Sequence, residues 1–70
     1  MTKLKQIRIA SGMTQTRLAE VSGVSLGVLK AYEQGRKPIN GAAALTVHRI
    51  ALALGCTVED LIDLNAQHSK

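Results

Sequence analysis

The chain has very few aromatic and sulfur-containing side chains. Tyr32 is its only aromatic residue and Cys56 its only cysteine in 70 residues. One cysteine excludes an internal disulfide and indicates a reducing, intracellular setting. One aromatic residue excludes the stacking platform that proteins use to bind single-stranded nucleic acid. Because Cys56 has no cluster of cysteines or histidines to match it, we expect it to act as a small apolar residue and not as a zinc ligand.

Long hydrophobic runs are also absent. The most apolar stretch, residues 41–56, is interrupted by Thr46, His48 and Arg49. No stretch approaches the roughly 18 consecutive apolar residues that a membrane span needs. Residues 1–12 lack the apolar middle and the cleavage site of a signal peptide. We therefore expect a cytoplasmic protein that does not contact a membrane.

The sequence lacks the combinations of residues that carry out catalysis. It shows no paired carboxylates in an expected cleft, no nucleophile with a matching base and no phosphate-binding glycine loop. Glu59, Asp60 and Asp63 gather around the start of an expected helix, where acidic side chains suit the helix dipole. His48 and His68 are far apart and have no ligand-like neighbours. We expect no enzymatic activity, no cofactor and no metal.

Length and charge favour one small domain with an anionic partner. A chain of 70 residues predicts a single core, and it buries only roughly 60% of its unfolded surface. Residues 1–37 contain seven basic and two acidic side chains, whereas residues 38–70 contain two basic and three acidic ones. The basic half favours a polyanionic partner. Net charge alone is also compatible with an ordinary soluble surface.

Helix caps and hydrophobic spacing predict five helices and no strand. The expected helices, each with its capping residue, run from residue 3 to about Ser11 (Thr2), 15–22 (Thr14), 26–33 (Ser25), 41–54 (Asn40) and 58–64 (Thr57). Asp60 completes a capping box with Thr57. The apolar residues that we expect on the inward sides are Leu4, Ile7, Ile9, Met13, Leu18, Ala19, Val21, Val28, Leu29, Tyr32, Leu45, Val47, Ile50, Ala51, Leu54, Val58, Leu61, Ile62 and Leu64.

Two of these short helices are joined by a turn within residues 12–35, GMTQTRLAEVSGVSLGVLKAYEQG. Gly23 and Val24 form the expected turn, and Gly35 ends the second helix of the pair. Two short helices joined by a glycine-containing turn are typical of the helix-turn-helix motif. In this motif the second helix usually lies in the major groove of DNA.

From roughly Leu4 to Leu64 the chain resembles the helix-turn-helix domains of phage repressors and Cro proteins, the xenobiotic response element family. The matching blocks, in the correct order, are LKQIR, TQTRLAEVSGVS, YEQGRKP and RIALALGCTVEDLI. The resemblance implies an all-α, compact, five-helix domain of the lambda-repressor type that fills residues 1–70, with a core over about 3–64 and a polar tail at 65–70. The chain has several extra residues between Pro38 and Ile50, which we expect to lengthen the fourth helix at its start.

The resemblance also implies which residues meet DNA. The base-facing positions are Leu26, Gly27, Lys30 and Ala31, and the phosphate-facing ones are Gln15, Ser25, Gln34, Arg36 and Lys37. Only Lys30 of the base-facing set can donate hydrogen bonds, either to guanine or to phosphate. Ser25 is expected to cap its helix as well. Arg8 and Glu33 match an internal ion pair of the family that holds the first helix against the end of the third.

These features predict a sequence-specific regulator of transcription that binds double-stranded DNA as a homodimer in the nucleoid, and a repressor more than an activator. The dimer face stays open between the fourth helix, the fifth helix and the tail. The alternative is a protein-interaction module, such as an antitoxin or another partner-binding helix-turn-helix protein with weak DNA binding. The apolar residues Leu26 and Ala31 on the outer side of the third helix support it. Only the DNA hypothesis predicts a steep fall of affinity with salt.

Overall fold

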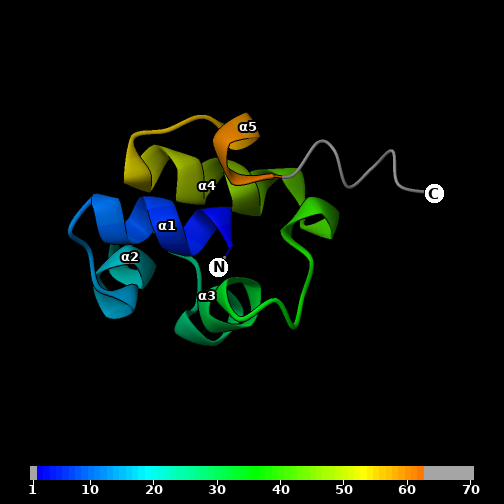
Figure 1. The fold of residues 1–70 in the computed structure, drawn as a ribbon, viewed down its shortest axis with the longest axis horizontal. Coiled ribbons are helices and arrows are strands. Elements are labelled where there is room, and N and C mark those ends of the chain that lie inside the picture. The colour runs from blue at the N-terminus through cyan, green and yellow to red at the C-terminus, as the bar shows by residue number, and fades with distance from the viewer. Residues whose placement is uncertain (1, 63–70) are drawn as a thin grey trace.

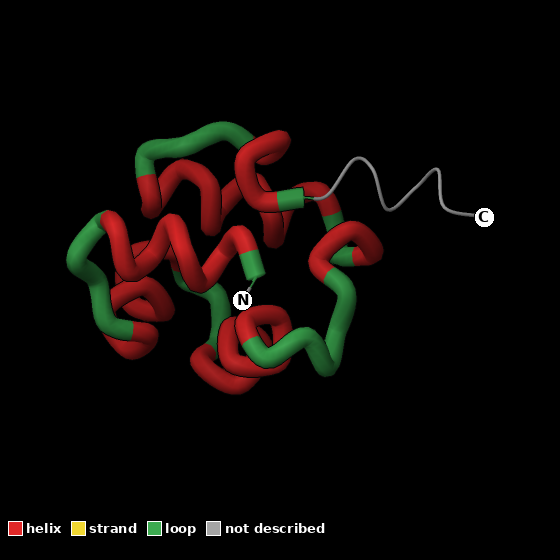
Figure 2. Tube along the Cα trace, in the orientation of Figure 1, coloured by secondary structure: helices red, strands yellow, loops and turns green. Residues whose placement is uncertain are grey.

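A computed structural model of the chain describes residues 2–62, and the only regular elements in this range are helices joined by turns and loops, without strands. The elements are α1 (Lys3–Ala10), α2 (Gln15–Ser22), α3 (Leu26–Glu33), the 3-10 turn η1 (Ile39–Gly41), α4 (Ala44–Leu54) and α5 (Val58–Leu61). In Figure 1, α1 crosses the middle, α2 and α3 lie below it, and α4 and α5 lie above it. The longest connection between helices joins α3 to α4 (Figure 2). The prediction of an all-α fold with five helices is confirmed.

Hydroxyl side chains begin four of the helices. The side-chain oxygens of the capping residues accept a hydrogen bond from the backbone N–H three residues further on, at 3.0–3.3 Å, in Thr2, Thr14, Ser25 and Thr57. Each bond satisfies one of the N–H groups that have no partner within the first turn of a helix. These local bonds explain why α2 and α3 begin where the sequence predicts.

The start of α4 differs from the prediction. The helix begins at Ala44, its N-cap is Ala43, and no side chain caps it. Asn40 and Gly41 instead belong to η1, and Ala42 is extended with φ −72° and ψ 154°. Glycine within a helix costs about 1 kcal/mol relative to alanine, so the extra residues form a separate turn and do not lengthen α4.

The core is small and mostly aliphatic. Its buried apolar side chains are Leu4, Leu18, Val24, Leu29, Tyr32, Val47, Ile50, Ala51 and Leu61. Every α-helix contributes at least one of them, so each depends on the others to cover its apolar side. Burying one large aliphatic side chain contributes roughly 1.5–3 kcal/mol. This core therefore supplies the main stabilisation of the domain.

Three of the residues predicted on inward sides are in fact exposed. Ile9, Val21 and Leu45 are 52%, 45% and 58% exposed. In α2 the inward positions are taken by Leu18 and Ser22, four residues apart on one side of the helix. Val21 lies about 100° around the helix from Ser22, at the edge of this side, and is left exposed.

The end of α5 also differs from the prediction. The helix ends at Leu61, because Ile62 is extended with φ −92° and ψ 159°. Ile62 nevertheless packs against the core from this extended position. Leu64, His68 and the tail at 65–70 lie outside the described residues.

The predicted capping box of α5 is confirmed and links stability to pH. Thr57 Oγ1 accepts from the backbone N–H of Asp60 at 3.2 Å, and the backbone N–H of Thr57 donates to Asp60 Oδ2 at 3.0 Å. The hydrogen bonds from Thr57, the backbone one first, lower the pKa of Asp60 from its ordinary value of 3.8. The carboxylate is therefore favoured in the folded state.

We expect Asp60→Asn to lower the melting temperature near neutral pH and to have a shrinking effect in acid. Because the pKa of Asp60 is lower in the folded state, its contribution is present above 3.8 and is lost as the pH falls through the folded pKa. Thermal melts of both proteins between about pH 6 and pH 2 measure this. A difference in melting temperature that stays constant over this range would contradict the role given to the carboxylate.

Candidate nucleic-acid interface

The turn between α2 and α3 is fixed by its backbone and by one buried hydroxyl. Gly23 has φ 75°, in the left-handed region that favours glycine. Ser22 is buried, and its Oγ accepts from the backbone N–H of Val24 at 3.1 Å. Ser22 is not among the predicted residues, and its only signal in the sequence is a hydroxyl residue just before the turn glycine. This bond, the conformation of Gly23 and the buried Val24 set the direction in which α3 leaves α2.

The helix α3 divides cleanly into an inner and an outer side. Leu29, Tyr32 and Glu33 are buried. The four residues that the resemblance assigns to bases share the opposite side: Gly27 and Lys30 are exposed, and Leu26 and Ala31 are partly exposed. The structure thus brings these four predicted residues together on one accessible surface.

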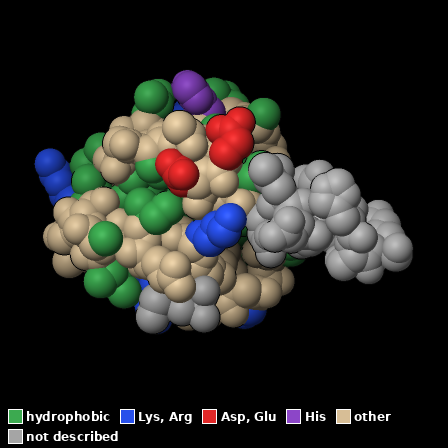
Figure 3. Space-filling view, turned by 45° about the horizontal axis from the view of Figure 1, so that its top comes forward, with side chains coloured by type: hydrophobic (Ala, Val, Ile, Leu, Met, Phe, Trp, Pro, Cys, Tyr) green, Lys and Arg blue, Asp and Glu red, His purple; other side chains and the backbone are tan. Residues whose placement is uncertain are grey.

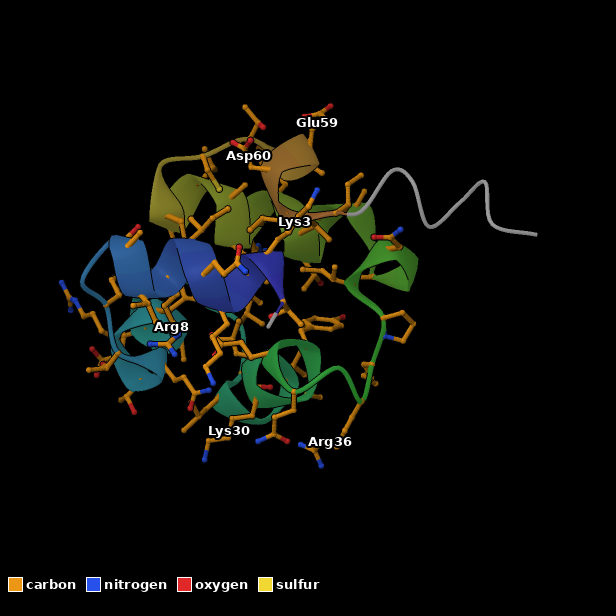
Figure 4. All side chains as sticks on the ribbon, viewed as in Figure 1. Lys3, Arg8, Lys30, Arg36, Glu59 and Asp60 are labelled. Atoms are coloured by element: carbon orange, nitrogen blue, oxygen red, sulfur yellow. The ribbon has the colours of Figure 1, made fainter. Side chains whose placement is uncertain are left out.

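The segment after α3 places two more cations next to this surface. The backbone N–H groups of Arg36 and Lys37 both donate to the carbonyl oxygen of Ala31, at 3.0 and 3.2 Å. These bonds tie the segment to the end of α3. Figure 4 shows Lys30 and Arg36 on the same side of the molecule. The side chains of Gln34, Arg36 and Lys37 are exposed, as is that of Lys30.

Three cations of this surface have no internal counter-ion. Within residues 2–62, no ion pair engages Lys30, Arg36 or Lys37. An unpaired group of exposed cations beside an accessible helix creates a positive potential. The surface is therefore suited to an anionic partner such as a phosphate backbone.

Gln15 and Ser25 have internal partners in the structure. Gln15 is the first residue of α2, and its Nε2 donates to Glu33 Oε1 at 3.0 Å. The Oγ of Ser25 accepts from the backbone N–H of Val28 at 3.3 Å. The predicted cap at Ser25 is confirmed, whereas the bond of Gln15 to Glu33 is not predicted from the sequence. A phosphate contact by either residue stays a prediction.

A buried ion pair lies behind the surface. Arg8 Nε and Nη2 donate to the two carboxylate oxygens of Glu33, at 2.6 and 3.1 Å. Their side chains are 11% and 1% exposed. Arg8 Nη1 also donates to the carbonyl oxygen of Met13 at 2.7 Å. With the bond from Gln15, this network fastens α1, the start of α2 and the end of α3 to one carboxylate.

Replacing either of two glycines of this region with alanine is expected to change the free energy of unfolding, with opposite signs at the two positions. Gly27 lies within α3, and an added Cβ would meet nothing within 4 Å, whereas Gly23 has φ 75°. We expect Gly27→Ala to raise the free energy of unfolding by about 0.5–1 kcal/mol. We expect Gly23→Ala to lower it by about 1–2 kcal/mol. Urea denaturation measures both, and a change of the same sign in the two variants would contradict this description of the turn.

Other kinds of site find no support in residues 2–62. No helix there is long and apolar enough to cross a membrane. No group of three histidine, cysteine or acidic side chains assembles where it could hold a metal ion. Cys56 packs against the core, and burial, followed by the nearby Asp60 charge, raises the pKa of its thiol.

Comparison with known proteins gives one family. The model of the Cro/C1-type HTH DNA-binding domain matches residues 3–67. Neither the curated proteins nor the solved structures contain a match.

Proposed function

The chain belongs to the family of Cro/C1-type HTH DNA-binding domains, and on this basis we propose that it is a sequence-specific repressor that reads the major groove with α3. The observation that carries the proposal is the accessible outer side of α3 with unpaired cations beside it. Membership of this family makes the chain a DNA-binding regulator of transcription. The repressor role and the groove are our inference.

Each residue on the outer side of α3 has a distinct task in the proposed complex. Gly27 has no side chain and permits close approach of the helix to the bases. Leu26 and Ala31 contact thymine methyl groups. Lys30 donates either to guanine or to a phosphate. Because this set offers little polar readout of bases, sequence-dependent DNA shape contributes to specificity.

Phosphate contacts set the position of α3 in the groove. Gln34, Arg36 and Lys37 reach the DNA backbone from the segment after α3. Gln15 and Ser25 stand at the N-termini of α2 and α3, where backbone N–H groups and the helix dipole favour anions. The bond of Gln15 to Glu33 links this contact to the end of α3.

The active form in this proposal is a homodimer. Two copies read half-sites about one helical turn apart, roughly 34–36 Å along the DNA. A small domain with weak polar readout gains both affinity and specificity from a second half-site. Binding of this kind blocks access of the polymerase, and it places the protein at the nucleoid in the cytoplasm.

The competing function is a protein-interaction module that binds DNA weakly. The partly exposed Leu26 and Ala31 at the outer side of α3 favour it. Fluorescence anisotropy with a labelled pool of random duplex DNA, at salt concentrations from about 50 to 200 mM, separates the two. The proposal predicts a dissociation constant that rises steeply with salt. Binding that is absent at the lowest salt would favour the protein-interaction module.

A further inference from the structure

A second accessible surface lies on α4. Its exposed residues are spaced three, one and three positions apart and so lie on one side of the helix. We term this surface the α4 stripe; it consists of Leu45, His48, Arg49 and Leu52. The two leucines at its ends are 58% and 67% exposed. They stand seven residues apart, a spacing at which one helix presents apolar anchors to another. The α4 stripe therefore has the form of a helix-binding surface.

The middle of the α4 stripe is cationic. Arg49 is exposed, and within residues 2–62 no ion pair or hydrogen bond engages its side chain. His48 lies beside it in the sequence and is also exposed. Along about 10 Å of helix, the stripe therefore presents an apolar side chain, then basic side chains, and then a second apolar side chain. Its electrostatic complement is an apolar, acidic, apolar surface.

The α4 stripe faces away from α3. The inward side of α4 buries Val47, Ile50 and Ala51, and the helix packs against α2 and α5. Figure 1 places α4 and α3 on opposite sides of α1. Figure 3, which turns the top of the molecule forward, shows apolar side chains and a histidine exposed at the top, with acidic side chains nearby. A partner on the stripe therefore leaves α3 accessible.

A second copy of the chain fits this surface poorly. If two α4 helices packed antiparallel about a two-fold axis so that Leu45 met Leu52 of the other copy, each Arg49 would face His48 of the other copy, and the two Arg49 side chains would both lie beside the axis. Like charges brought together across an interface disfavour association. Such a dimer would also direct its two α3 helices to opposite sides, where they could not bind one operator. This second reason rests on the proposed function, whereas the first does not.

We propose that the α4 stripe binds an acidic amphipathic helix of another protein. Two apolar side chains of the partner pack at Leu45 and Leu52, and carboxylates between them pair with Arg49. The chain then binds this protein and DNA on opposite faces, as a regulator that positions a partner requires.

The test uses the full chain and two synthetic helical peptides of about 18 residues. The first peptide carries two leucines seven residues apart with two glutamates between them, and the second has lysines in place of the glutamates. Each is titrated into the ¹⁵N-labelled chain while amide chemical shifts are followed by NMR. We expect shifts centred on residues 44–53 and an affinity about tenfold higher for the glutamate peptide.

Variants separate the contributions of charge and apolar contact. Leu52→Ser should abolish binding of the glutamate peptide, and Arg49→Glu should reverse the preference between the two peptides. Equal affinity for both peptides, or shifts centred away from α4, would overturn the proposal. So would sedimentation showing a dimer that Leu52→Glu converts to a monomer, because that result assigns the stripe to a second copy. DNA affinity is unaffected in Leu52→Ser, so failure here is distinct from failure of the DNA proposal.

Discussion

Glu33→Ala is expected to lower the free energy of unfolding by roughly 3–5 kcal/mol, the largest effect of any single substitution considered for this chain. The carboxylate is 1% exposed and accepts from both Arg8 and Gln15. Alanine leaves the guanidinium of Arg8, 11% exposed, without its counter-ion inside the protein. An unpaired buried charge is much more costly than the loss of an exposed ion pair.

Thermal unfolding followed by circular dichroism measures this effect. For a domain of this size, each 1 kcal/mol corresponds to a shift of roughly 4–8 °C in melting temperature. Glu20→Ala is the matched control, because it removes the carboxylate of the exposed pair between Arg17 and Glu20, whose side chains are 65% and 63% exposed. We expect less than about 1 kcal/mol for the control. Equal melting temperatures for Glu33→Ala and the wild type would contradict the structural role of the buried pair.

The double variant Arg36→Ala/Lys37→Ala is expected to weaken DNA binding roughly a hundredfold, about tenfold for each lost charged contact. It should also reduce the slope of log affinity against log salt by about 1.8, since each phosphate contact contributes about 0.9. Both side chains are exposed and carry no internal ion pair, and both belong to the segment tied to the end of α3. Their removal therefore costs little stability.

Lys30 is distinguished from these two residues by the same measurement. If Lys30 contacts phosphate, Lys30→Ala lowers the slope of log affinity against log salt by about 0.9 and weakens binding to all DNA sequences alike. If Lys30 contacts guanine, the affinity falls mainly for the preferred sequence. Arg49→Ala is the control, because it removes one positive charge from the face turned away from α3. An equal loss of slope in Arg49→Ala and Arg36→Ala would show that only net charge matters, and would contradict a defined interface.

Local signals account for what the sequence predicted correctly. Thr14 and Ser25 are capping hydroxyls directly before α2 and α3, and their hydrogen bonds lie within one turn of helix. Gly23 marks a backbone conformation that glycine adopts readily. The capping box of Thr57 and Asp60 is likewise complete within four residues. Features of this kind need no knowledge of the rest of the fold.

The predictions that are wrong or missing concern residues whose positions depend on contacts with distant parts of the chain. Whether Leu45 lies inside or outside depends on which side of α4 meets α2 and α5, and hydrophobicity alone placed it wrongly. Asn40 is a good capping residue, yet the connection from α3 to α4 uses it in η1. The bond of Gln15 to Glu33 spans 18 residues, so nothing in the local sequence indicates it. The DNA contacts themselves rest on the resemblance and on accessibility.

The central claim, that α3 reads a specific duplex sequence, is tested most directly by selection from a random duplex library. The bound pool is sequenced at about physiological salt, where specific binding exceeds non-specific binding by roughly a thousandfold or more. We expect an enriched palindrome with half-sites about one helical turn apart. We also expect Lys30→Ala, Arg36→Ala and Lys37→Ala each to weaken binding to that palindrome. A pool with no enriched sequence and no salt-sensitive binding would contradict the reading of DNA by α3.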